Sequence, residues 1–249
     1  MTGATPALPD LATLYDVVEH TWPAAKLCEV GPWTLREGAG GGKRVSAATA
    51  RAPCAAEDVP LAAERMRQMG QPPLFMIRQG EDALDTMLTQ LGYEVIDPVN
   101  IWACPVAALC THRPPRTTSF NLWEPMAIQR DIWADGGIGP GRIAVMERAQ
   151  GPKTALFGRH ENRPAATGFV AIHAGIAMVH ALEVRAPHRR AGMGRHLMIE
   201  AAFWARDQGA AHLAVICTKA NAAANALYTS LGMTLVGEYH YRILKEARV

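Results

Sequence analysis

Two short segments in the C-terminal half carry residues whose types and spacing suit chemistry. The first runs from residue 184 to residue 195 and places two glycines among arginines. Glycine lets the backbone approach a ligand closely and adopt unusual dihedral angles. The helix expected to follow opens with unpaired N–H groups at the positive end of its dipole. The segment therefore predicts a seat for a pyrophosphate, built from Arg189, Arg190, Ala191, Gly192, Met193, Gly194 and Arg195.

A plain strand-to-helix turn with a solvated basic edge would also explain a bare Gly-x-Gly. The arginines on both sides of the glycines favour the anion seat, because a local group of positive charges attracts a local anion.

The second segment, residues 221–228, opens a predicted helix after a predicted strand. Asn221 is a good N-cap residue. Asn225 lies one turn later, and Tyr228 follows one turn further along the same side. Taken alone, Tyr228 is as well explained by packing as by catalysis.

The hydrophobic pattern predicts strands and helices around both segments. In the second half we expect strands at 119–123, 154–157, 167–173, 177–184, 212–217 and 235–244, and helices at 126–133, 142–149, 194–208 and 221–231. In the first half we expect helices at 11–26, 61–69 and 82–91, and strands at 33–36, 44–47, 74–77, 93–96 and 99–102. The strands at 33–36 and 44–47 would flank a glycine-rich tip at 38–42.

The two segments together, separated by one helix and one strand, resemble the GNAT superfamily of acyl-CoA-dependent N-acetyltransferases. The family's loop, Q/R-x-x-G-x-G/A, is matched in full from Arg189 to Gly194. Its later pattern, N-x-x-A-x-x-L-Y-x-x-x-G-F, is matched from Asn221 to Gly232 and departs at Met233. The resemblance covers about residues 117–244. It implies an α/β fold (mixed α+β, mostly antiparallel), with a central twisted sheet flanked by helices.

The resemblance also implies a mechanism with acetyl-CoA as co-substrate and no metal. The strands 177–184 and 212–217 would splay, and the pantetheine arm would pair with the backbone of Leu182 and Val184, whose N–H could polarise the thioester. Glu183 would accept the amine proton and Tyr228 would protonate the leaving thiolate. Further cofactor contacts are implied for Asn221, Ala224 and Asn225.

Several of these roles have a second explanation. Glu183 is equally explained by a salt bridge to Arg185 or Arg242, and His173 and His180 are further possible bases. The segments 135–141 and 239–242 are possible elements of an acceptor site.

The sequences of the two halves also resemble each other at an offset of 140 residues. The run Thr89–Val95 aligns with Thr229–Leu235, whereas the glycine loop at 192–194 faces Ala52, Pro53 and Cys54. We therefore expect a tandem protein, with a degenerate acetyltransferase-like domain at 1–110 and a catalytic domain at 117–249. The proline-bearing run 111–116 would connect them.

Composition limits the classes of function. A net charge of +2 is too small for a nucleic-acid partner. Five cysteines without CxxC spacing argue against a disulfide framework or structural zinc. No signal peptide or membrane span is expected, so we predict a cytoplasmic protein without a membrane partner. The acceptor would be a small-molecule or peptide amine, and the oligomeric state is open. Three competing hypotheses are a non-catalytic acyl-CoA-binding regulatory module, an enzyme with another acyl-CoA donor, and an enzyme with a protein lysine acceptor.

Overall fold

The computed structural model describes residues 7–115 and 117–244, and these residues form two compact units. Unit 1 combines the residues up to 23 with 101–217 and 221–236. Unit 2 combines 24–100 with 218–220 and the residues from 237 onward. Arg116, the last residue of the predicted connector, lies outside the described residues.

Unit 1 has the mixed α/β architecture, with a mostly antiparallel sheet, that the sequence predicted. Strands β6 to β9 pair antiparallel in sequence order, and β10 then pairs parallel with β9. The strands are β6 (Ser119–Leu122), β7 (Lys153–His160), β8 (Arg163–His173), β9 (Ile176–Val184) and β10 (His212–Thr218). The helices are α1 (Leu11–Thr21), α4 (Val106–Leu109), α5 (Ala127–Asp135), α6 (Pro140–Arg148), α7 (Met193–Asp207) and α8 (Ala222–Ser230), with a 3-10 turn at Ala186–His188.

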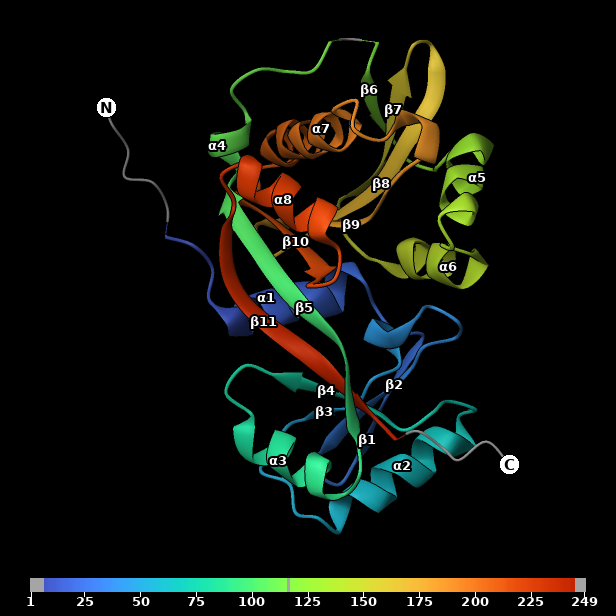
Figure 1. Cartoon of the computed structure of the whole chain (residues 1–249), viewed down its shortest axis with the longest axis vertical. Coiled ribbons are helices and arrows are strands. Elements are labelled where there is room, and N and C mark those ends of the chain that lie inside the picture. Colours follow the sequence, from blue (N-terminus) through green and yellow to red (C-terminus); the bar gives the residue numbers. More distant parts are fainter. Residues whose placement is uncertain (1–6, 116, 245–249) are drawn as a thin grey trace. The chain divides into compact units, whose positions relative to one another are not determined.

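Helices α7 and α1 cover opposite faces of this sheet, and Figure 1 shows α7 across β7, β8 and β9. Val170 and Val179 pack into the same apolar cluster as Leu197 of α7. Their chain neighbours Phe169 and His180 contact Trp22 at the end of α1 instead. Successive strand residues face opposite ways, so both faces are buried and the strands are almost continuously apolar.

Unit 2 contains a three-stranded antiparallel sheet of β1 (Lys26–Val30), β2 (Trp33–Glu37) and β3 (Thr49–Ala50). It also holds α2 (Asp58–Gln68), β4 (Leu74–Arg78) and α3 (Asp82–Gln90). Its core includes Trp33, Leu35, Phe75 and Leu88.

The predicted hairpin around residues 38–42 is wrong. The real hairpin joins β1 to β2 through a two-residue turn at Gly31, whose φ is +53°. Residues 43–45 form a 3-10 turn instead of a strand. Gly42 has a φ of +92°, and a Cβ on Gly38 would meet Ser46 Oγ at about 2 Å, so the chain folds back tightly on itself here.

Two long strands cross from one unit to the other. β5 (Glu94–Pro105) starts in unit 2 and ends in unit 1, whereas β11 (Thr234–Ile243) starts in unit 1 and ends in unit 2, where it pairs with β4. The strands predicted separately at 93–96 and 99–102 thus form one continuous strand, β5. The strand region predicted at 235–244 is also a single strand, β11. The units therefore do not follow the predicted boundary between residues 110 and 117, because α1 and the two crossing strands depart from sequence order.

The segments that are similar at an offset of 140 residues form the same secondary structure. α3 spans 82–90 and α8 spans 222–230, and a glycine with positive φ follows each at 92 and 232. The hydrogen bond from Tyr93 N to Leu88 O has its counterpart from Met233 N to Tyr228 O. The sequence similarity therefore reflects the same helix and the same C-terminal turn in both units.

Candidate active site

Strands β9 and β10 separate partway along their length. Parallel pairing joins Ile176–Val179 to residues 212–215 and, within the described residues, goes no further. Beyond that point His180, Glu183 and Val184 of β9 pair on their other side with β8. The edge of β9 that faces β10 is therefore not paired with β10 beyond Val179.

A bulge reorients β9 where the strands separate. Ala181 has a φ of +50°, the register with β8 shifts between Thr167 and Phe169, and Trp133 Nε1 donates to Ala181 O at 2.8 Å. Arg185 N donates to Ala165 O of the neighbouring strand. Since successive residues of a strand alternate in direction, the N–H of Val184 points toward the separated edge.

The predicted pyrophosphate loop leads directly into α7. Gly192 is the N-cap in a left-handed conformation with a φ of +78°, and a Cβ on Gly194 would lie 3.0 Å from Leu227 of α8. Position 192 therefore favours glycine because of its backbone conformation, and position 194 favours glycine because Leu227 approaches closely. Arg190 and Arg195 are exposed, and the first N–H groups of α7 have no partner within the helix.

One histidine that the sequence analysis did not single out lies in the same first turn. Burial, together with the charge of Arg195 and the nearby His160, lowers the pKa of His196. Its ring is therefore neutral near pH 7, and the positive charge of the loop comes from arginines and the helix dipole.

Arg189 lies differently from the other loop arginines. Its Nε donates to Val184 O at 3.0 Å, and its Nη2 donates to Glu183 Oε1 at 3.2 Å. The guanidinium thus holds the end of β9 and its carboxylate together.

Glu183 lies against the loop between α5 and α6. A Cβ built on Gly136 would come within 2.6 Å of Glu183 Cγ and Cδ, so the carboxylate side chain occupies the space above that glycine. Its ion-pair partner is Arg189, and neither of the two predicted arginines takes that role. Arg185 pairs with Asp135 and Arg242 with Asp85. The sequence pointed to the loop 135–141 but not to Gly136 in particular, because its contact with Glu183 involves a strand far along the chain.

Tyr228 lies near Cys217, at the end of β10 that is separated from β9. It is 3% exposed, and the partly buried Leu182, Val184 and Cys217 pack against the same apolar cluster. Burial, and secondarily Cys217, raises the pKa of the Tyr228 hydroxyl well above its usual value. The side chain therefore stays protonated and can act as a donor.

The asparagines of α8 are occupied by local hydrogen bonds. Asn221 Oδ1 accepts from Ala224 N, as an N-cap should. Asn225 Oδ1 accepts from Trp102 Nε1 at 3.1 Å and from Cys217 Sγ at 3.3 Å, and its Nδ2 donates to Asn221 O. Both residues thus shape the start of α8.

The remaining predicted residues lie elsewhere. His180 is buried, lies at a tilt to the Trp22 ring and is 2.9 Å from Thr21 Oγ1, while His173 contacts Asp16. Residues 239–242 belong to unit 2, where Tyr239 and Tyr241 are buried.

Comparison with known proteins agrees with this geometry. Residues 123–233 match the Acetyltransferase (GNAT) family. The chain is 27% identical over 251 residues to the uncharacterized N-acetyltransferase YobR of Bacillus subtilis (strain 168), which covers 95% of this chain and 99% of YobR.

Solved structures share the fold. A GCN5-related N-acetyltransferase from Kribbella flavida superposes with a TM-score of 0.70 at 17% identity, covering 97% of this chain and 98% of that one. A tandem GNAT protein from the clavulanic acid biosynthesis pathway gives a TM-score of 0.59 at 10% identity, covering 78% and 69%. The chain is thus similar to GNAT acetyltransferases, and residues 123–233 carry the match to that family. No helix among the described residues is long and apolar enough to cross a membrane.

Proposed function

We propose that this protein transfers an acetyl group from acetyl-CoA to a primary amine by direct attack in a ternary complex. The observation that carries the proposal is the separation of β9 from β10 after Val179. This opening has the 189–195 loop at one end of β9 and Tyr228 in the apolar cluster beside it.

The CoA portion would be bound mainly by backbone groups. The exposed Arg190 and Arg195 and the N-terminal N–H groups of α7 fit a pyrophosphate. The edge of β9 at Leu182 and at the N–H of Val184 fits the amide groups of a pantetheine arm. Arg189 is committed to Val184 O and Glu183, so we assign it a positioning role at the end of β9.

The chemistry requires one proton acceptor and one donor. Glu183 would take a proton from the ammonium form of the acceptor, directly or through water. The free amine nitrogen then bonds to the thioester carbon, whose oxygen the Val184 N–H would stabilise. As the carbon–sulfur bond breaks, the thiolate takes a proton from Tyr228, which burial keeps protonated. The acylated nitrogen loses its extra proton to water, and a proton from water restores the Tyr228 hydroxyl.

Thiol release from acetyl-CoA over a panel of primary amines tests the proposal. We expect amine-dependent release that falls sharply in Glu183→Gln and Tyr228→Phe. CoA binding by calorimetry without turnover on any amine would instead favour a non-catalytic acyl-CoA-binding module. Turnover only with propionyl- or longer acyl-CoA would identify an acyltransferase with a different donor. Turnover only with lysine peptides would identify a protein lysine acetyltransferase.

We also propose that unit 2 is the degenerate half of a tandem pair. The support is the shared helix and turn at 82–92 and 222–232, with Leu88 at the position that Tyr228 has in unit 1. All five cysteines are free thiols, which fits the reducing compartment expected for a cytoplasmic protein.

A further inference from the structure

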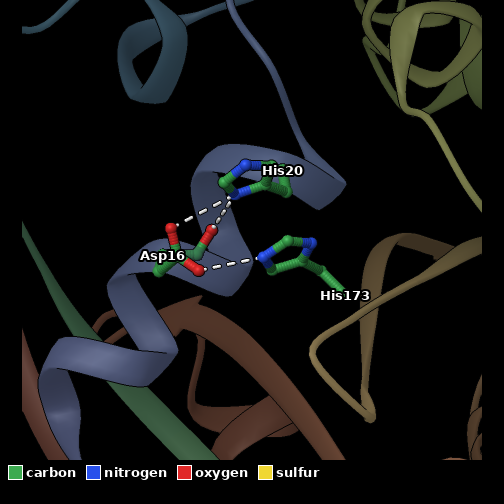
Figure 2. Close-up of side chains that lie close together, drawn as sticks. All are labelled: Asp16, His20 and His173. Carbon is green, nitrogen blue, oxygen red and sulfur yellow. Dashed lines mark hydrogen bonds and ion pairs between the residues drawn. The ribbon is translucent and has the colours of Figure 1, made fainter.

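A second polar cluster lies in unit 1, on the α1 face of the sheet. Asp16 and His20 are four residues apart on α1, and His173 is the last residue of β8 (Figure 2). His20 Nδ1 lies 3.3 Å from Asp16 Oδ1, and His173 Nε2 lies 2.9 Å from Asp16 Oδ2. The two imidazole rings stack with centroids 3.7 Å apart and an interplanar angle of 2°.

We propose that this cluster binds a divalent transition metal of the zinc class, with one carboxylate and two imidazoles as ligands. One ligand atom from each of the three residues lies within 4.8 Å of the other two. Imidazole nitrogen suits zinc, nickel and copper, whereas calcium and magnesium prefer oxygen ligands only. The i, i+4 spacing on a helix is suited to chelation because it puts both side chains on one face.

The separations already approach those of a coordination shell. Ligands about 2.0–2.1 Å from a tetrahedral zinc ion lie roughly 3.3 Å from one another. The two carboxylate–imidazole distances, 2.9 and 3.3 Å, are close to that spacing, and each involves a different oxygen of Asp16. His20 Nδ1 also lies 2.9 Å from the backbone oxygen of Asp16, a contact that it must give up to bind the ion. The rings are parallel, so one must turn about its Cβ–Cγ bond to direct its lone pair at the same point as the other.

Exposure makes that turn easy and leaves the ion accessible. The side chains of Asp16 and His20 are about half exposed, and that of His173 is one-third exposed. Three protein ligands leave at least one position for water or another ligand. The bound ion would tie α1 to the end of β8, beside the contacts that Thr21 and Trp22 already make with His180.

Zinc titration of the tag-free full chain, followed by calorimetry in a non-chelating buffer, tests the site. We expect one zinc per chain, and affinity at least about tenfold weaker in His173→Gln and in His20→Gln, the loss typical of disturbing a metal site. His112→Gln, at an exposed histidine outside the cluster, should bind like the wild type. At zinc concentrations about 100 times the dissociation constant, the Tm should rise by about 5 °C or more and fall back with EDTA.

Cobalt provides an independent readout of ligand type. Bound Co²⁺ should give visible d–d absorption without thiolate-to-cobalt charge transfer, because no cysteine belongs to the cluster. Unchanged zinc affinity in both His173→Gln and His20→Gln, with native circular dichroism, would overturn the proposal. Loss of binding in His188→Gln alone would also overturn it, since that histidine forms the separate pair with His160. The test depends on no acetyl transfer, so its outcome is independent of the proposed reaction.

Discussion

Replacing Gly136 by alanine tests whether Glu183 must be held in place for catalysis. Gly136 has an ordinary φ of −85°, so alanine causes no backbone strain there. The new Cβ would lie 2.6 Å from Glu183 Cγ and Cδ, whereas ordinary contact begins near 3.4 Å. The carboxylate side chain must therefore retreat by about 0.8 Å, and a misplacement of about 1 Å costs roughly 100-fold in rate. We expect kcat/KM to fall by about 10- to 100-fold.

The matched control is Gly139→Ala in the same loop. Gly139 also has a φ of −85°, and a Cβ there would meet no atom within 4 Å. Thiol release with an acceptor from the amine panel measures turnover, and calorimetry measures CoA affinity, which neither variant should change greatly. If Gly136→Ala turns over at the wild-type rate, the exact position of Glu183 does not matter. Its assignment as the proton acceptor would then be refuted.

Further predictions concern the rest of the site. Tyr228→Phe keeps the ring packing and removes the proton donor, so kcat should fall at least about tenfold while KM for the amine changes much less; wild-type kcat would show another donor. Burial raises the pKa of the Cys217 thiol to about 11, so only about 0.1% is thiolate at pH 8. Alkylation followed by mass spectrometry should therefore be slow at pH 8 and accelerate as the pH rises toward 11; fast labelling at pH 8 would contradict this. Gly192→Val places a β-branched residue at a φ of +78° and should abolish CoA binding by calorimetry, and undiminished binding would remove the loop from the site. The chain should bind one CoA, and a calorimetric stoichiometry of two would reveal a second site in unit 2.

The sequence predicted most elements of unit 1, because their signals are local. The strand at 177–184 and the helix at 194–208 were expected within about two residues of β9 and α7. The loop between them was expected because glycines and arginines alternate over a few positions. The strand predicted at 44–47 was also inferred from a local pattern, and that prediction was wrong. The positive φ of Gly42 and the tight packing of Gly38 favour a 3-10 turn there.

Features that depend on contacts between distant segments could not be read from the sequence. Arg189 was expected to bind phosphate, but whether it reaches Val184 O or solvent depends on the turn that precedes α7. The three residues of the proposed metal site include one separated from the others by more than 150 positions. Only the packing of α1 on β8 brings His173 to Asp16.

The crossing strands contribute different polar residues to the two matching helices, α8 of unit 1 and α3 of unit 2. In unit 1, Trp102 of β5 donates to Asn225 of α8, and in unit 2, Arg242 of β11 donates to Asp85 of α3 at 2.7 Å. Trp102 and Arg242 are 140 positions apart, and so are Asp85 and Asn225. The helix of each unit is therefore contacted by a crossing strand at the equivalent position.

The two pairs have different electrostatic consequences. In unit 2, hydrogen bonds from Arg242 and His240 lower the pKa of Asp85, which keeps a charged pair beside α3. In unit 1 the pair is neutral, and its asparagine also accepts from Cys217 at the separated end of β10. Tyr228 is buried among neutral groups and stays protonated, so it can donate a proton. Leu88, which has the equivalent position in unit 2, has no proton to donate. The chemistry that we propose for unit 1 therefore depends on the residues at a few positions of a helix and turn that unit 2 also contains.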